Sequence, residues 1–422
     1  MPFNMYGDKK QASFQSAIKY TVLIGQYFGL NPVSGVSDSD SCNLRFYVWS
    51  RRSIYSALSI CAQGLVFILC VLNVFKETRA SLSSIMFCSS NCLTTILFYR
   101  AAVKWAKLCT YISKIEAIDP NTDVSFATKC NLSCLVILTL ALVEHVFANL
   151  SKIVYVFNCY ADDDKYEAFI LHSFPWVFNI LNYETLVGVL VQFLNIQCTF
   201  NWNFADLFVI CVSFYLISRL NQVYRKIVAA KEKQIEIPFW RSIREEYNRD
   251  TKLVRRFNDV IGGIIFISYA NNLFFICMQL RNTLAKGIKA TPPCSIERYE
   301  QAVYFMYSFI FLVVRSLSVS LIAAQVHTAS LAPAQILYDI PSSHFNIEMR
   351  RLMDQIHGTT VALSGLQFFQ IKRGLVLTVA TDQMSSQSVR VIVSHTKCAS
   401  QPENISPYIF IYRSEFSQAG GR

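Results

Sequence analysis

The sequence predicts an all-α protein that crosses a membrane several times. Hydrophobic residues make up 53% of the 422 positions and charged residues 16%, and the mean hydropathy is +0.33. A soluble domain is more polar than this, so lipid must cover part of the surface. Apolar stretches with few charges recur along the chain, each with at least the roughly 20 residues that a helix needs to cross the bilayer core.

Six of these stretches are predicted spans, and the first two form a hairpin because few residues separate them. The spans are residues 53–75, 80–99, 132–157, 185–218, 260–280 and 304–326. At about 1.5 Å per residue the fourth would be roughly 50 Å long, well beyond the hydrocarbon core. We therefore expect its end to project into the cytosol as a helix.

A seventh apolar run, residues 168–182, is not predicted to span. It is short, it contains Pro175, and a group of acidic residues precedes it, whereas a dense group of basic residues follows the fourth span. Basic connections stay on the cytosolic side of a membrane. One crossing, the fourth span, therefore separates the acidic group from the basic group.

Charge also predicts the orientation of the chain. The connections after the second and fourth spans are both basic, which places them in the cytosol together with the N-terminus. The connection after the fifth span also holds basic residues and is the exception to this pattern. Residues 1–52 are then a cytosolic segment, and residues 53–326 are the six-span domain.

The C-terminal part is predicted to stay in the cytosol. Residues 327–380 contain an amphipathic helix, predicted over residues 349–380, whose end resembles the first turns of another apolar helix. Residues 381–422 are polar and hold only short apolar runs, so no span can be built from them. We expect this tail to be disordered.

Several classes of function find no support in the sequence. The formal charge of +11 comes from basic residues in the connections, so topology explains it better than a nucleic-acid partner does. The fourteen cysteines show no zinc-site spacing, and phosphate-loop, nucleophile-elbow and metal-helix motifs are missing, so neither an enzyme nor a cofactor is indicated. Cys159 and Cys294 lie in different outer connections, where an oxidising exterior would permit a disulfide between them.

Seven sequence motifs, in the same order, resemble those of the sugar-sensing branch of insect gustatory receptors. They are QYFGLNPVSGV at residues 26–36, NWNFADLF at 201–208, SRLNQV at 218–223, REEY at 244–247, SYANNLFFICMQL at 268–280, VRSLSVSLIAAQVH at 314–327 and ALSGLQFFQIKRGLVLTVA at 362–380. The resemblance covers residues 13–380. It implies the insect chemoreceptor seven-helix fold, with six spans present in this chain and the seventh missing.

The resemblance also implies a ligand-gated cation channel in the plasma membrane of gustatory neurons, assembled as a homo- or hetero-tetramer. In that family an apolar helix that lines the pore follows the position of Ala380, and the polar tail takes its place here. We therefore expect that the chain does not conduct alone. A regulatory or inactive isoform that assembles with full-length receptors is the alternative.

Sugars are bound by aromatic rings that stack on their C–H faces and by amides or carboxylates that bond their hydroxyls. The outer halves of the later spans offer both kinds of side chain. The candidates are Glu184, Gln192, Asn195, Asn271, Asn272, Phe275, Gln279, Tyr304 and Tyr307. For each residue taken singly, a hydrogen bond that holds membrane helices together is the competing interpretation.

Three ionisable residues lie inside predicted spans, namely Glu144, His145 and Arg315. Such residues usually pair with one another or face a water-filled site. Either Glu144 pairs with Arg315, or one of the two meets a ligand hydroxyl. Asp206 is assigned to helix packing or subunit contacts, and Trp202 to the core.

The sequence argues against two other classes of membrane protein, G-protein-coupled receptors and transporters. A G-protein-coupled receptor requires an external N-terminus, against the charge pattern, and its Asp-Arg-Tyr and Asn-Pro-x-x-Tyr motifs do not appear at the span ends. A transporter would show interrupted helices repeated in two halves, and the sequence has no such pattern.

Overall fold

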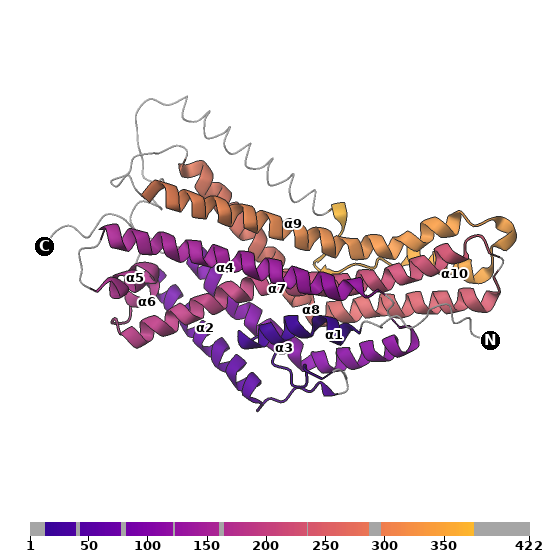
Figure 1. Ribbon diagram of the computed structural model, residues 1–422, viewed down its shortest axis with the longest axis horizontal. Coiled ribbons are helices and arrows are strands. Elements are labelled where there is room, and N and C mark those ends of the chain that lie inside the picture. The colour runs from indigo at the N-terminus through magenta and orange to yellow at the C-terminus, as the bar shows by residue number, and fades with distance from the viewer. Residues whose placement is uncertain are drawn as a thin grey trace, which may run out of the picture.

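Long helices run roughly along the long axis of the molecule in the computed structural model (Figure 1). The structure describes residues 13–38, 43–76, 82–120, 123–159, 164–233, 235–286 and 297–374. The helices are α1 (Phe14–Tyr27), α2 (Arg51–Lys76), α3 (Leu82–Ile118), α4 (Ser125–Cys159), α5 (Lys165–Ser173), α6 (Pro175–Phe178), α7 (Thr185–Ala230), α8 (Ile237–Lys286), α9 (Glu297–Tyr338) and α10 (Ile347–Gly358).

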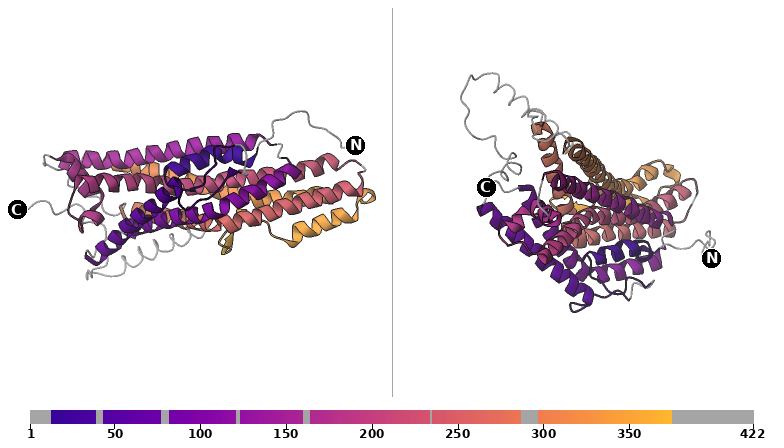
Figure 2. Two further views of the ribbon diagram at one scale, coloured as in Figure 1. Left: turned by 90° about the horizontal axis from the view of Figure 1, so that it is seen from below. Right: turned by 60° about the vertical axis from the view of Figure 1, so that its left-hand side comes forward.

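The six predicted spans are confirmed as α2, α3, α4, α7, α8 and α9, each long and apolar enough to cross a membrane. Several helices continue well past their apolar stretch. The 46 residues of α7 give a length of roughly 69 Å at about 1.5 Å per residue, more than twice the hydrocarbon thickness. The short helices α5 and α6 lie at one end of the bundle and α10 at the other (Figures 1 and 2), here called the α5–α6 end and the α10 end.

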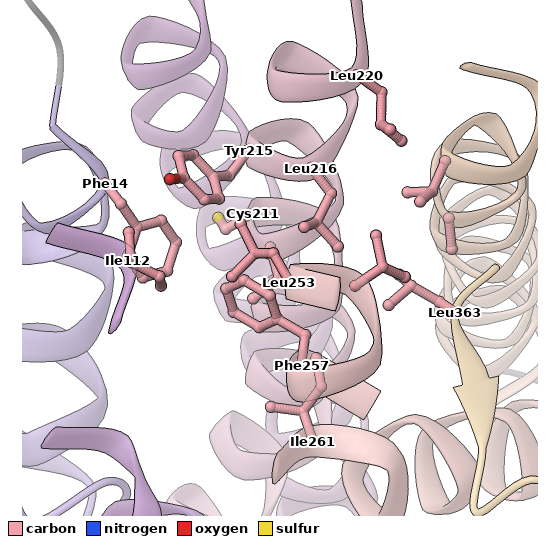
Figure 3. Close-up of a cluster of buried hydrophobic side chains, with 14 of the residues drawn as sticks. Phe14, Ile112, Cys211, Tyr215, Leu216, Leu220, Leu253, Phe257, Ile261 and Leu363 are labelled. Carbon is pink, nitrogen blue, oxygen red and sulfur yellow. The ribbon is translucent and has the colours of Figure 1, made fainter. Parts of the chain in front are cut away.

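Helix α7 occupies the centre of the bundle. In its most apolar segment 89% of the residues are buried, compared with 17% in α4, because α7 packs against α4, α8 and α9. Figure 3 shows Tyr215 and Cys211 of α7 meeting Phe14 of α1 and Phe257 of α8. The Phe14 ring centroid lies 4.6 Å from that of Tyr215 and 5.7 Å from that of Phe257. Aromatic contacts of this kind join the N-terminal helix to the core.

Helix α1 is a feature that the sequence prediction missed, because residues 1–52 were expected only to be a cytosolic segment. It begins at Ser13, whose hydroxyl accepts a hydrogen bond from Ser16 N, and it is followed by a tight loop. The Gln26 amide donates to the carbonyls of Asn31 and Val33, at 3.1 and 2.7 Å. Asn31 itself adopts a φ of 49°, which Asn tolerates better than most residues.

The run over residues 168–182 does not span, as predicted. Asp164 caps α5, and its carboxylate accepts hydrogen bonds from the backbone of Tyr166 and Glu167. Helix α5 has 9 residues and α6 has 4, with Pro175 at the first position of α6. Their apolar side chains, among them Ile170 and Phe174, form a small core with Val191 of α7.

The predicted amphipathic helix over residues 349–380 is wrong in length. Helix α10 ends at Gly358, and a two-stranded antiparallel hairpin of β1 (Ser364–Gly365) and β2 (Phe369–Gln370) follows. The hairpin packs on α8, where the Asn258 side chain bonds the backbone of Ala362 and Ser364 at 2.9 and 3.1 Å. These bonds pair backbone N–H and C=O groups that would otherwise be paired by the hydrogen bonds of a helix.

Two predictions fall outside the described residues. Cys294 is not described and neither is the side chain of Cys159, so the predicted disulfide is untested. The same holds for residues 375–422, which include the predicted start of a seventh span and the polar tail.

Candidate functional site

An ion pair lies at the centre of the bundle, among apolar helices. Arg315 of α9 and Asp206 of α7 are 3% and 0% exposed, and the guanidinium Nε lies 2.8 Å from the carboxylate. One of the two interpretations of the sequence pairs Arg315 with Glu144, but in the structure Arg315 pairs with Asp206 instead. A buried charge without a partner would be very costly, which is why both ionised groups lie together.

Amides and a hydroxyl from α7 and α8 surround this pair. Arg315 donates to the side-chain oxygen of Asn203 and, at 3.3 Å, to that of Asn272. Asn272 donates in turn to Asp206 at 3.0 Å, and the Ser268 hydroxyl also donates to Asp206. The prediction placed Asn272 in a ligand site, and in this structure its side chain bonds other helices.

A second polar group lies one to two turns away, toward the α5–α6 end, and is centred on Ser308 of α9. The Ser308 hydroxyl donates to the Glu144 carboxylate at 2.5 Å and accepts from the Gln279 amide at 3.2 Å. Tyr304 lies four positions before Ser308 on α9, on the same helical face. The structure thus brings together Glu144, Gln279 and Tyr304, three of the predicted residues, from α4, α8 and α9.

Aromatic rings line the same region. The Trp202 ring centroid lies 4.6 Å from that of Phe275, and the Arg315 guanidinium lies over both Trp202 and Phe311, at 4.8 and 5.3 Å from their centroids. Tyr307 stacks on Phe311 and donates to the Leu140 carbonyl at 3.0 Å. Two predicted aromatic residues, Phe275 and Tyr307, therefore lie beside the polar groups. Together these polar and aromatic residues form what we call the central polar cluster, namely Glu144, Trp202, Asn203, Asp206, Ser268, Asn272, Phe275, Gln279, Tyr304, Tyr307, Ser308, Phe311 and Arg315.

Other predicted residues lie outside the central polar cluster. Glu184 is exposed at the start of α7, where its side chain makes no capping bond. Asn195 lines a cavity of about 30 Å³ between α2, α3, α6 and α7, which has room for about one water molecule. Gln192 and Asn271 each have a buried side-chain oxygen without a hydrogen-bond partner among the described residues. His145 also has a buried ring nitrogen, Nε2, without one.

The prediction missed six members of the cluster as site residues: Trp202, Asn203, Asp206, Ser268, Ser308 and Phe311. A signal was present, because polar side chains recur at helical spacing inside apolar spans. Residues 195, 199, 203 and 206 of α7 are all polar, as are residues 268, 272 and 279 of α8. Such a stripe identifies one face of a helix.

The α10 end holds a separate group of ion pairs. Buried Arg219 lies 2.9 Å from Asp250, and Arg249 lies 2.7 Å from Asp119. Glu348 of α10 lies 2.7 Å from Arg244 of α8, and this bond is the main reason why the pKa of Glu348 is lowered. These pairs tie together the helix extensions beyond the apolar stretches.

The chemistry of the central polar cluster suits hydrogen bonding rather than metal or covalent chemistry. Among the described residues, no group of three or more His, Cys, Asp and Glu side chains could hold a metal ion. Carboxylate, amide, hydroxyl and indole groups beside flat aromatic rings are the groups that bind polyhydroxylated ligands.

Comparison with known proteins adds the family. Residues 5–390 match the model of the trehalose receptor family. Two relatives from Drosophila melanogaster are the gustatory receptor for sugar taste 64f, 29% identical over 375 residues, and the gustatory receptor 5a for trehalose, 27% identical over 375 residues. The alignments cover 87% of this chain in both cases, and 78% and 82% of the two relatives.

Solved structures show the same fold. The insect olfactory receptor OR5 from Machilis hrabei in complex with eugenol superposes with a TM-score of 0.66 at 12% identity, covering 90% of this chain and 98% of that chain. This likeness identifies the insect chemoreceptor fold, and the family match covers nearly the whole sequence. The chain therefore belongs to the trehalose receptor family, a family of multi-pass membrane receptors and not of enzymes.

Proposed function

We propose that this chain is a sugar-sensing subunit of a tetrameric, ligand-gated cation channel in the plasma membrane of gustatory neurons. The observation that carries the proposal is the central polar cluster, an array of carboxylate, amide and aromatic groups inside the spanning region of a trehalose receptor family member. Its relatives include a gustatory receptor for sugar taste and a gustatory receptor for trehalose, which supports a sugar as the ligand.

The sugar would bind where Glu144, Gln279 and Ser308 meet. Glu144 has free lone pairs after accepting from Ser308, and Trp202 has a buried indole N–H without a partner among the described residues. Sugar hydroxyls would supply the missing acceptors and donors. Because Ser308 is hydrogen-bonded to both Glu144 and Gln279, the ligand-bound state requires these side chains to separate. A sugar that binds the separated state better would shift the equilibrium toward it.

Conduction is proposed to need other subunits. Residues 381–422 hold only short apolar runs at the place where the family's pore-lining helix stands. The chain would then either complete a channel formed by full-length receptors or reduce the current of such a channel as a regulatory subunit.

Coexpression with a full-length sugar receptor tests these points. We expect no sugar-evoked current from the chain alone and an altered current when both proteins are present. In the coexpressed channel, Glu144→Gln should raise the half-maximal sugar concentration about tenfold, the effect of losing a hydrogen bond to a charged group.

The matched control is Glu232→Gln, an exposed carboxylate at the α10 end, which should leave the response unchanged. Surface biotinylation must show equal amounts of both variants. A normal sugar response from Glu144→Gln would refute the ligand contact, and loss of surface protein would assign Glu144 to folding. Unchanged currents and no copurification would refute the association with full-length receptors.

A further inference from the structure

Seven exposed basic side chains gather along the paired helices α3 and α8. We define this basic flank as Arg100, Lys104, Lys107, Lys114, Lys252, Arg255 and Arg256. Within the described part of the chain, none of them forms an ion pair. Several other basic residues at the same end are paired with carboxylates, namely Arg219, Arg225, Lys226, Arg244 and Arg249. The flank thus holds seven positive charges that take no part in these ion pairs.

The basic residues of α3 lie on one helical face. Residues 100, 104, 107, 111 and 114 are spaced by four and three positions in turn, which aligns their side chains. Helix α8 lies directly beside this face, because the Arg256 guanidinium lies 3.7 Å from the ring centroid of Tyr111. Closer to the α5–α6 end, a Cβ added to Gly263 would lie only 2.8 Å from Cδ2 of Leu97. Three basic residues of α3, Arg100, Lys104 and Lys107, lie between these two contacts.

The flank begins where the apolar stretches end. The charge-free stretch of α3 ends at Tyr99 and that of α8 begins at Val260. Because Leu97 contacts Gly263, these two stretches end at a similar depth in the membrane. Lys107 is about 12 Å beyond Tyr99 along the helix. Leu93 lies on the other side of Tyr99, within the apolar stretch of α3. It is 43% exposed, as expected for a side chain that faces lipid tails. The first basic groups are therefore at the depth of lipid headgroups.

We propose that the part of the basic flank nearest the membrane, which excludes Lys114 and Lys252, binds the headgroup of a phosphoinositide, a phospholipid with several phosphates, in the cytosolic leaflet. Arg100, Lys104 and Lys107 would contact the phosphates from α3, and Arg255 and Arg256 from α8. Five cations on two adjacent helices exceed what one phosphate can satisfy, whereas several phosphates on one ring match them. The proposal rests on the orientation proposed above, which places the α10 end in the cytosol.

One acidic residue opposes this charge. Asp259 is exposed on α8, four positions from Arg255 and three from Arg256, which places it on the same face. It lowers the positive potential at the edge of the flank. Its removal therefore offers a variant that should strengthen binding rather than weaken it.

The experiment uses the purified full-length chain and a fluorescent short-chain phosphatidylinositol 4,5-bisphosphate, with binding measured by titration. The variant Arg100→Gln/Lys104→Gln/Lys107→Gln should bind on the order of a hundredfold more weakly, because each basic residue near an anionic surface contributes roughly a factor of five. The control Lys114→Gln/Lys252→Gln/Arg350→Gln loses the same charge farther from the membrane and should change the affinity much less. Asp259→Asn should tighten binding about fivefold.

Three results would overturn the proposal. The first is a triple α3 variant that binds like the wild type, or, if that variant does not fold, an Asp259→Asn variant without effect. The second is equal binding to nanodiscs that carry phosphatidylserine at matched charge, which would mean diffuse attraction without a site. The third is equal affinity for soluble inositol trisphosphate, which would mean a cytosolic anion site. Because no sugar or current is measured, the outcome is independent of the proposed function.

Discussion

Arg315 shows how a single residue fixes the arrangement of three helices. Its guanidinium lies between the rings of Trp202 and Phe311 and contacts Asp206, so nearly all of its surface is covered. A charge in this position is tolerated because the opposite charge and the amide oxygens of Asn203 and Asn272 surround it. The pair thereby holds α7, α8 and α9 in one register.

Replacing Asp206 with Asn should destabilise the protein by about 3–5 kcal/mol, because the substitution leaves Arg315 buried without a counter-charge. The melting temperature, followed by fluorescence-detected size exclusion, measures the loss. The double variant Asp206→Asn/Arg315→Gln removes both charges and should be more stable than Asp206→Asn alone. Asp259→Asn removes an exposed carboxylate and serves as the control. Equal melting of Asp206→Asn and wild type would show that the pair contributes little.

At the scale of elements, α5 and α6 form a small cap at one end of the bundle. The His172 ring of α5 packs on Tyr155 of α4, with centroids 4.5 Å apart. Burial, together with the nearby positive charge of Lys152, lowers the pKa of His172. His172 is therefore neutral in the folded protein at neutral pH. The unfolded chain binds this proton more readily, so stability is lost as the pH falls below about 6.5.

Acidification should accordingly loosen the cap through His172. Between about pH 7.5 and about pH 5.5, the melting temperature of the wild type should fall by about 2–4 °C more than that of His172→Phe, which keeps the aromatic contact but cannot take up a proton. His357→Phe, on exposed α10, should retain the wild-type response. An identical pH dependence for His172→Phe would remove His172 as the cause.

At the scale of the whole molecule, the two ends of the bundle differ. At the α5–α6 end the connection between α4 and α7 holds only the short helices α5 and α6, whereas at the α10 end α3, α7, α8 and α9 continue beyond their apolar stretches and are joined by ion pairs. Basic residues are abundant at the α10 end. Because basic segments remain in the cytosol, this asymmetry supports the proposed orientation.

Epitope tags test the orientation directly. A tag at Met1 should be detected only after permeabilisation of the cells, whereas a tag between Asp162 and Asp163, before α5, should be detected on intact cells. A tag after Glu232, in the connection between α7 and α8, is the internal control. Detection of the Met1 tag on intact cells would reverse the orientation and would favour the arrangement of a G-protein-coupled receptor.

The candidate site could be predicted from the sequence only in part. Gln279, Tyr304 and Glu144 were identified because polar groups inside apolar spans are conspicuous, and the structure brings them together around Ser308. The partner of Arg315 could not be predicted. Periodicity identifies the face of a helix on which a residue lies, but the level at which two helices meet depends on how their side chains interlock.

The sequence by itself determined the number of spans, the projection of α7 and the family, because hydrophobic length, charge distribution and motif order are properties of the chain alone. Only the tertiary structure decided that α1 packs into the core, that a hairpin follows Gly358 and that Asp206 meets Arg315. The hairpin turn contains Leu366 and Gln367 at positive φ, which neither residue favours. Contacts with α8 stabilise that turn, and contacts between distant segments leave no periodic signal in the sequence.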